Sequence, residues 1–99
     1  MVKHIVLWNF NQEMSEKEKL EAGAKIKTLL EPIKDMVEGT IAMRVVINKM
    51  ESSNRDILLI ADFESEEALK AYQLHPAHVA AGKYIGTVTY NRSCLDYEV

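Results

Sequence analysis

The residues best suited to chemistry lie in one short stretch, "AYQLHPAHVAAGKY", at positions 71–84. It holds His75 and His78, three positions apart around Pro76, and Tyr72 stands six residues before the second histidine. An imidazole titrates near neutral pH and can either move a proton or bind a metal ion. The stretch therefore raises three possibilities: a metal site, an acid–base pair, or a structural corner between two helices.

A metal site is the weakest of these possibilities. Histidines at i and i+3 can share an ion, but zinc sites use at least three protein ligands. Neither a cysteine nor an acidic residue accompanies His75 and His78 nearby, and Pro76 between them disfavours both rings pointing the same way. The sequence therefore predicts no metal here.

An acid–base pair is chemically reasonable. Removal of a proton from a carbon beside a carbonyl needs a base, for which His78 is suited. It also needs a donor for the developing oxyanion, which the Tyr72 hydroxyl can supply. On a helix beginning near Pro76, His78 shares a face with Ala81, Gly82 and Ile85, and the two small residues leave room beside the imidazole.

A structural role explains the same residues equally well at this point. Proline is favoured in the first turn of a helix, where its missing amide costs nothing. His75 could cap that helix or bond a nearby carbonyl. His78 could fill a partly buried corner above Tyr72. Both interpretations stay open.

Four strands and two helical regions must position these residues. Residues 3–10 are apolar on both alternating sets, with His4, Val6, Trp8 and Phe10 on one face, and predict a strand covered on both sides. Ser15 and Glu18 form a capping box for a helix over 15–31, followed by a looser turn to about 37 because Pro32 interrupts it.

The second half of the chain predicts a hairpin, a broken helix and a last strand. Strands over 40–50 and 56–63 flank the turn-forming "ESSNR". Ser65 caps a helix that must break at Pro76, and a second helical piece covers 77–85. Alternation over 87–97 predicts the final strand.

The resulting order, β-α-β-β-α-β, predicts an α+β, ferredoxin-like fold with a four-stranded antiparallel sheet. Helices on one face leave the other bare, although the first and third strands are apolar there too. Large exposed apolar patches are rare on monomers. We therefore expect a homodimer through this sheet face, forming a dimeric α/β barrel able to hold a small ligand.

Composition limits the partners and the setting. Ninety-nine residues predict one domain, 1–99. A net charge of −3 argues against nucleic acid, and no apolar run is long enough for a membrane span. Because Cys94 is the single cysteine, no intrachain disulfide can form. We interpret Cys94 as a small, partly buried strand residue. With no leader pattern at the N-terminus, we expect a cytoplasmic protein.

Three segments carry a resemblance to known proteins: "VKHIVLWNF" at 2–10, "FESEEALKAY" at 63–72 and "HPAHVAAGKYI" at 75–85. On these segments the chain resembles, over nearly its whole length, the stress-responsive dimeric α/β-barrel (Dabb) family. The resemblance implies a homodimer whose sheets form a barrel. One plant branch of the family contains polyketide cyclases that close a ring by intramolecular aldol chemistry, in which a Tyr and a His placed as "Y-x-x-H-P-A-H" act between the helices and the sheet. The matching residues are Tyr72 and His78, and His4 matches near the first strand.

Two functions remain expected from the sequence. In the first, a cofactor-free cyclase or lyase, or a small-molecule binder, uses His78 as base and Tyr72 as donor on a small apolar or carbonyl-containing ligand. Its pocket wall is predicted to contain His4, Trp8, Ala81, Gly82 and Ile85. In the second, a non-catalytic stress-associated protein uses the same corner as architecture. No Gly-rich phosphate loop is present, so no nucleotide cofactor is expected.

Overall fold

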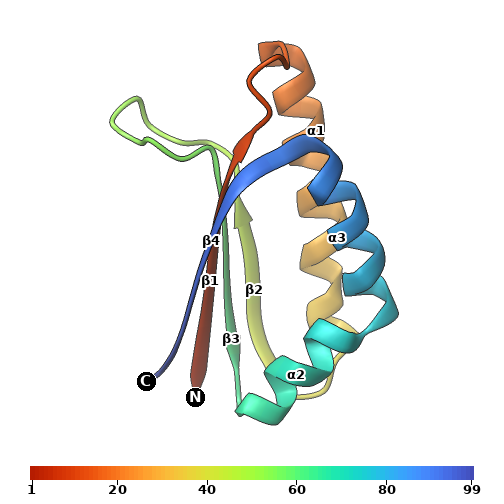
Figure 1. The fold of residues 1–99 in the computed structure, drawn as a ribbon. Coiled ribbons are helices and arrows are strands. Elements are labelled where there is room, and N and C mark those ends of the chain that lie inside the picture. Colours follow the sequence, from red (N-terminus) through yellow and green to blue (C-terminus); the bar gives the residue numbers. More distant parts are fainter.

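The fold is one antiparallel sheet with its helices on a single side, seen in a computed structural model that describes residues 1–99 (Figure 1). The strands lie in the order β2-β3-β1-β4. The elements follow the predicted order, with the second helical region divided in two. They are β1 (Val2–Phe10), α1 (Glu16–Leu30), the 3-10 helix η1 (Glu31–Asp35), β2 (Thr40–Val46), β3 (Ile57–Phe63), α2 (Glu66–Leu74), α3 (Pro76–Val88) and β4 (Thr89–Glu98).

Local sequence signals set the helix starts as predicted. Ser15 accepts a hydrogen bond from the Glu18 amide at 3.1 Å, and the Glu18 carboxylate accepts from the Ser15 amide at 2.8 Å, which completes the capping box. Ser65 caps α2 with its side chain alone, which accepts a hydrogen bond from the Ala68 amide at 3.2 Å. Pro32 lies at the start of η1, so the predicted loosening of the helix after residue 31 is confirmed.

Three predicted boundaries were wrong. The strand expected over 40–50 ends at Val46, because the residues beyond it enter the polar β2–β3 connection. The helix expected over 77–85 continues to Val88, and the strand expected from 87 begins at Thr89. No residue after Ile85 stops the helix, and the Thr89 amide still bonds the Ile85 carbonyl.

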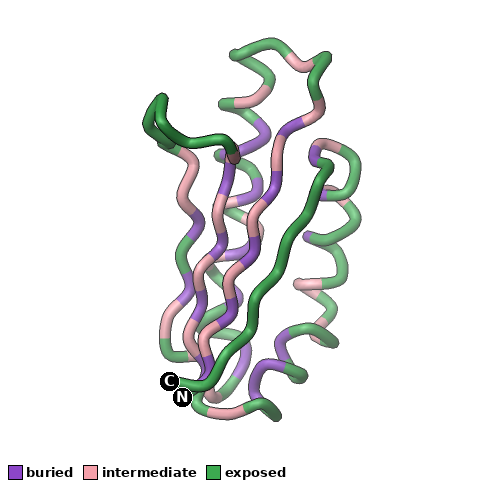
Figure 2. Tube along the Cα trace, turned by 60° about the vertical axis from the view of Figure 1, so that its left-hand side comes forward, coloured by how far each residue is buried: buried purple, intermediate pink, exposed green.

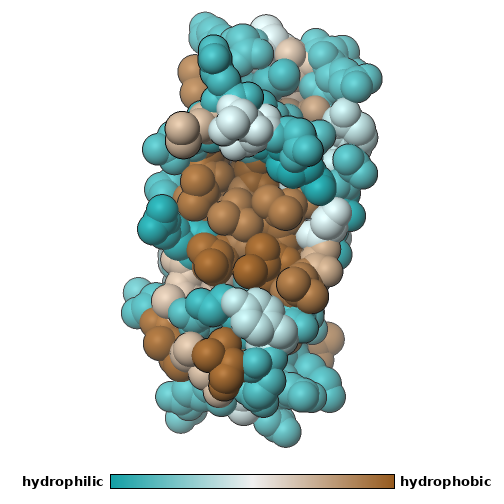
Figure 3. All heavy atoms as spheres, turned by 90° about the vertical axis from the view of Figure 1, so that its left-hand side faces the viewer, coloured by the Kyte–Doolittle hydropathy of each residue, from teal (hydrophilic) through white to brown (hydrophobic).

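The two faces of β1 differ as its alternation predicts. His4, Val6, Trp8 and Phe10 are buried toward the helices, and the intervening residues are only half-buried (Figure 2). On the side away from the helices an apolar patch fills the middle of the sheet (Figure 3). We call this side the open sheet face; its apolar residues include Ile5, Leu7, Val46, Leu58, Ile60 and Leu95. No helix of the fold has the length and apolar content needed to cross a bilayer.

A β-bulge interrupts the pairing of β4 with β1. Leu7 pairs with Ser93 and Asn9 pairs with Tyr90, so two residues of β4, Asn91 and Arg92, lie opposite Trp8 alone. Asn91 adopts a left-handed conformation with φ of 59°, which asparagine tolerates better than most residues. The extra residue reverses the alternation of β4, so that its even-numbered residues beyond the bulge turn toward the helices.

Candidate functional site

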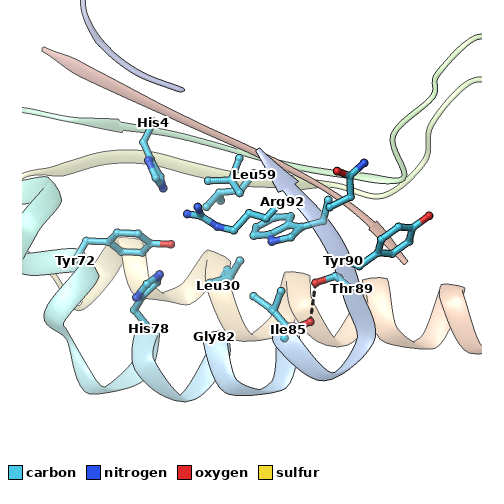
Figure 4. Close-up of a pocket in the computed structure, with 14 residues that line it drawn as sticks. His4, Leu30, Leu59, Tyr72, His78, Gly82, Ile85, Thr89, Tyr90 and Arg92 are labelled. Carbon is cyan, nitrogen blue, oxygen red and sulfur yellow. Dashed lines mark hydrogen bonds between the residues drawn. The ribbon is translucent and has the colours of Figure 1, made fainter. Parts of the chain in front are cut away.

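A cavity of about 280 Å³ lies between α3 and the helix-facing side of β1 and β4 (Figure 4). Most of the predicted site residues line it: Tyr72, His78, His4, Trp8, Gly82 and Ile85. Ala81 does not; it is fully buried in the hydrophobic core. The other lining residues are Val6, Leu30, Leu59, Gly86, Thr89, Tyr90, Asn91 and Arg92.

The Tyr72 hydroxyl is the most unusual group of the cavity. Tyr72 is fully buried near the end of α2, yet its hydroxyl oxygen has no hydrogen-bond partner. In Figure 4 this hydroxyl points into the cavity. Burial raises the pKa of the phenol well above its usual value, because the phenolate would be poorly solvated. Tyr72 therefore offers a protonated donor that the protein leaves free.

The corner between α2 and α3 places His78 beside Tyr72. His75 is extended, with φ of −63° and ψ of 136°, and its Nδ1 accepts the Ala77 amide at 3.1 Å, which caps α3. Pro76 follows as the first helical residue. The two histidines therefore do not converge on a shared point: His75 caps α3, whereas His78 lines the cavity.

His78 is held as a neutral imidazole. Its ring centroid lies 4.4 Å from that of Tyr72. Its Nδ1 lies 3.0 Å from the Gln73 carbonyl oxygen, which only accepts, so Nδ1 carries the proton and Nε2 keeps its lone pair. Burial lowers the pKa of His78; the hydrogen bond to the Gln73 carbonyl opposes this shift, and the neighbouring His4 and Arg92 add to it. An unprotonated Nε2 at neutral pH is what a general base requires.

His4 reaches the same cavity from the sheet. It is buried, and its ring centroid lies 6.0 Å from that of Tyr72. Asp96, its pairing partner on β4, contacts Nδ1 through a carboxylate oxygen. This contact fixes Nδ1 as the protonated nitrogen and orients the ring. The sequence did not indicate Asp96, because the two residues are 92 positions apart.

Cys94 joins His4 and Asp96 in a small cluster. Its sulfur lies 3.8 Å from His4 Nδ1 and 3.6 Å from the Asp96 carboxylate. The three residues each offer one possible ligand atom, and these atoms lie within 4.8 Å of one another. The pKa of Cys94 is raised by burial and by Asp96, so the thiol is not activated as a nucleophile. The cluster is thus a hydrogen-bonded support for His4.

Two glycines of α3 line the cavity without adding a side chain to it. Gly82 and Gly86 lie one turn apart on α3, and a Cβ atom added at either would meet nothing within 4 Å. Alanine would favour the helix at both positions. Their effect is extra space opposite the strands.

The cavity thus gathers the parts of an acid–base site. Tyr72 supplies a free donor, and His78 and His4 each keep Nδ1 occupied by an oxygen acceptor. Figure 4 shows His4 directed from the sheet and His78 from α3, on either side of Tyr72. Such a group can accept a proton from carbon and stabilise the oxyanion that results.

Comparison with solved structures identifies similar folds. A dimeric ferredoxin-like protein of unknown function from Bacteroides fragilis is 32% identical with a TM-score of 0.91, over 99% of this chain and 95% of that chain. A dimeric ferredoxin-like protein of unknown function from Thermobifida fusca is 22% identical with a TM-score of 0.82, over 99% and 90%. A Dabb family protein from Mesorhizobium loti is 16% identical with a TM-score of 0.75, over 99% and 95%. The last two likenesses show the fold alone.

Sequence comparison gives the family. No protein with a curated description matches the chain. The family model described as the stress responsive A/B barrel domain (Dabb) matches residues 2–99. The 32% identity to the Bacteroides fragilis protein over nearly the full length of both chains agrees with that match. The chain therefore belongs to the stress responsive A/B barrel (Dabb) domain family.

Proposed function

We propose that this protein is a homodimeric, single-domain Dabb protein that binds a small apolar or carbonyl-containing ligand in its cavity and carries out cofactor-independent proton-transfer chemistry of the aldol cyclase or lyase type. One observation carries the proposal: the Tyr72 hydroxyl is buried, unpartnered and directed into a cavity that His78 also lines. A buried hydroxyl without a partner is costly unless a ligand satisfies it.

The proposed reaction needs no oxidant or metal. His78 Nε2 takes a proton from carbon beside a ligand carbonyl; the C–H electron pair forms the C=C bond of an enolate, and the carbonyl π pair moves to the oxygen, where the Tyr72 hydroxyl stabilises the charge. The enolate carbon then forms a bond to a second carbonyl carbon of the ligand, while the first carbonyl re-forms and the π pair of the second moves to its own oxygen. The oxygen of that carbonyl receives the proton from His78, so charge and atoms balance.

The remaining wall residues shape the space around the reacting atoms. Trp8 and Ile85 supply apolar surface, and Gly82 leaves room between them. His4, fixed by Asp96, stands opposite His78. These features suit a small ligand that is apolar along its length and polar at its carbonyl groups.

A second candidate is a binding protein without catalysis. The observation that favours it is that the one hydrogen bond of His78 goes to a backbone carbonyl, that of Gln73. No side chain orients the imidazole as catalytic histidines are usually oriented. In this case Tyr72 and His78 would hold a ligand oxygen without transferring a proton.

The decisive experiment combines binding and exchange. A small-molecule screen by native mass spectrometry and thermal shift compares native protein with His78→Ala and with His75→Asn, a control at the α3 cap. For each ligand found, NMR follows deuterium entry from D₂O beside the carbonyl. We expect native protein to exceed His78→Ala by about 10²-fold or more in exchange. Exchange equal in the two proteins, with binding retained, establishes the non-catalytic alternative instead.

The homodimer is proposed to form through the open sheet face. The Bacteroides fragilis and Thermobifida fusca relatives are described as dimeric, and this face is apolar where a monomer would expose it to water. Light scattering should give twice the 11.3 kDa chain mass. Ile60→Arg on this face should give single chains, whereas Leu20→Arg, at an exposed position on α1, should not. A native mass of one chain overturns the proposal.

We also place the protein in the cytoplasm, because its single cysteine, Cys94, suits a reducing compartment. Localisation of a fluorescent fusion tests this.

A further inference from the structure

Arg92 is the one residue lining the cavity that carries a permanent charge. It forms no ion pair with any carboxylate of the chain. Figure 4 shows its guanidinium extended from β4 across the cavity, toward Tyr72 and His4. An unpaired guanidinium beside an apolar wall is an attractive position for an anion.

The bulge in β4 directs the Arg92 side chain toward the cavity. Without the bulge at Asn91, the alternation of β4 would turn Arg92 toward the open sheet face. The left-handed conformation of Asn91 is an unfavourable one for most residues, and bulges of this kind commonly re-aim a side chain.

A second arginine holds the bulge in place. Arg55, which precedes β3, donates to the Leu7 carbonyl at 3.0 Å, to the Asn9 side chain at 3.0 Å and to the Ser93 hydroxyl at 3.1 Å, and it also contacts the Asn91 carbonyl. Four acceptors from β1 and β4 thus fix the two strands where Arg92 leaves the sheet. Because these contacts hold the backbone at Arg92 in place, Arg92 loses less conformational entropy when it binds a ligand.

The position of Arg92 relates it to the proposed reacting groups. Its positive charge acts on both groups: it partly opposes the rise that burial gives the pKa of Tyr72, and it adds to the fall that burial gives the pKa of His78. A ligand that touches all three groups must be anionic at one end and carry its carbonyl at the other. The planar guanidinium fork matches a carboxylate in two parallel hydrogen bonds. A doubly charged phosphate monoester would find only this one permanent cation in the cavity lining.

We propose that the ligand of this cavity is a keto acid, whose carboxylate pairs with Arg92 while its carbonyl oxygen accepts from the Tyr72 hydroxyl. The inference rests on the proposed function for the carbonyl end of the ligand and adds its charged end. Arg92 is then a specificity-determining residue, which selects acids over neutral ketones of the same length.

The test compares acids with their esters. The probes are acetoacetate, levulinate and their longer homologues, each paired with its methyl ester, and binding is measured by titration calorimetry and ligand-observed NMR. For the best-fitting length we expect the acid to bind native protein about tenfold more tightly than the ester. Arg92→Gln should remove this preference, and Arg92→Lys, which keeps the charge but not the fork, should keep part of it.

A matched control separates a site from a net-charge effect. Lys83→Gln removes one positive charge from an exposed position on α3 that lines no cavity described here, and should keep the preference for acids. Equal binding of acid and ester by native protein overturns the inference, and so does the absence of acid binding. The same holds if Lys83→Gln lowers the preference as much as Arg92→Gln.

The two proposals fail in different ways. If esters bind as well as acids, and binding needs Tyr72, the carbonyl site stands and the carboxylate end is wrong. If acids bind through Arg92 while Tyr72→Phe changes neither affinity nor deuterium exchange, the charged end stands and the proposed reaction is wrong.

Discussion

The Arg55 guanidinium contacts the carbonyl oxygen of Asn91, the left-handed residue of the β4 bulge. One side chain at the start of β3 thereby controls the backbone of a strand that is not its neighbour in the sheet. The same guanidinium reaches acceptors on β1, so it joins three strands at one level. At this level of the sheet the Arg92 side chain enters the cavity.

Replacing Arg55 should therefore weaken both fold and site. Arg55→Ala loses several charge-assisted hydrogen bonds, and we expect the free energy of unfolding to fall by about 2 kcal/mol in urea denaturation. Arg55→Lys keeps a charge but cannot span the four acceptors, and should recover only a small part of the loss. In both variants the preference for acids over esters should weaken, because the bulge no longer holds Arg92. Unchanged stability in Arg55→Ala would contradict this account.

Removing the Tyr72 hydroxyl should stabilise the protein while it impairs the site. Tyr72→Phe deletes a buried group that has no hydrogen-bond partner. We expect the free energy of unfolding to rise by about 1 kcal/mol and ligand binding to fall. Tyr84→Phe, outside the cavity, should change stability by less than about 0.5 kcal/mol. A loss of stability in Tyr72→Phe would show that the hydroxyl has a structural partner in solution.

Acid should destabilise the protein through His78. Burial lowers the pKa of His78 in the folded state below its ordinary value of 6.5, so the unfolded chain binds the proton first as the pH falls. Stability from this group is complete above about pH 6.5 and is lost below it, until the folded state also protonates. Urea denaturation at pH 7.5 and pH 5.5 measures the loss. His78→Asn should lose less over this interval, and an identical loss would contradict the assignment.

The glycines of α3 give a prediction with opposite signs for stability and function. Gly82→Ala places a methyl group in open space and should raise the free energy of unfolding by about 0.5–1 kcal/mol. Gly23→Ala on α1 should instead destabilise, because its Cβ would lie 3.1 Å from Ile47. Gly82→Leu should fold normally and lose ligand binding, because its side chain fills the cavity. Unimpaired binding in Gly82→Leu would place the ligand elsewhere.

The local signals in the sequence were sufficient for the fold. The capping box at Ser15 and the break at Pro76 each act within a few residues, so their effects are visible without tertiary information. The meeting of Tyr72 and His78 follows from the same corner. The helix end at Val88 was missed because no residue type marks it.

The strand side of the site could not be predicted in this way. Asp96 supports His4, and Arg92 enters the cavity, only because the bulge at Asn91 reverses the alternation of β4. The sequence signal for a bulge is weak, because an asparagine such as Asn91 is common in turns as well as in bulges. Ala81 was expected in the cavity wall but lies in the core, because the helix presents it toward the packed interior.

The bulge also has a consequence for how this fold can diversify. Closing the bulge without loss of a residue would shift the pairing of β4 with β1 by one position and exchange the two faces of β4, so that Ser93, Leu95 and Tyr97 would replace Arg92, Cys94 and Asp96 beside the cavity. Substitutions that favour or disfavour the bulge could thus convert a charged ligand chamber into an uncharged one, with the helices and the rest of the sheet unchanged. The residue at the left-handed position of Asn91 is accordingly the place to look when related chains differ in what they bind.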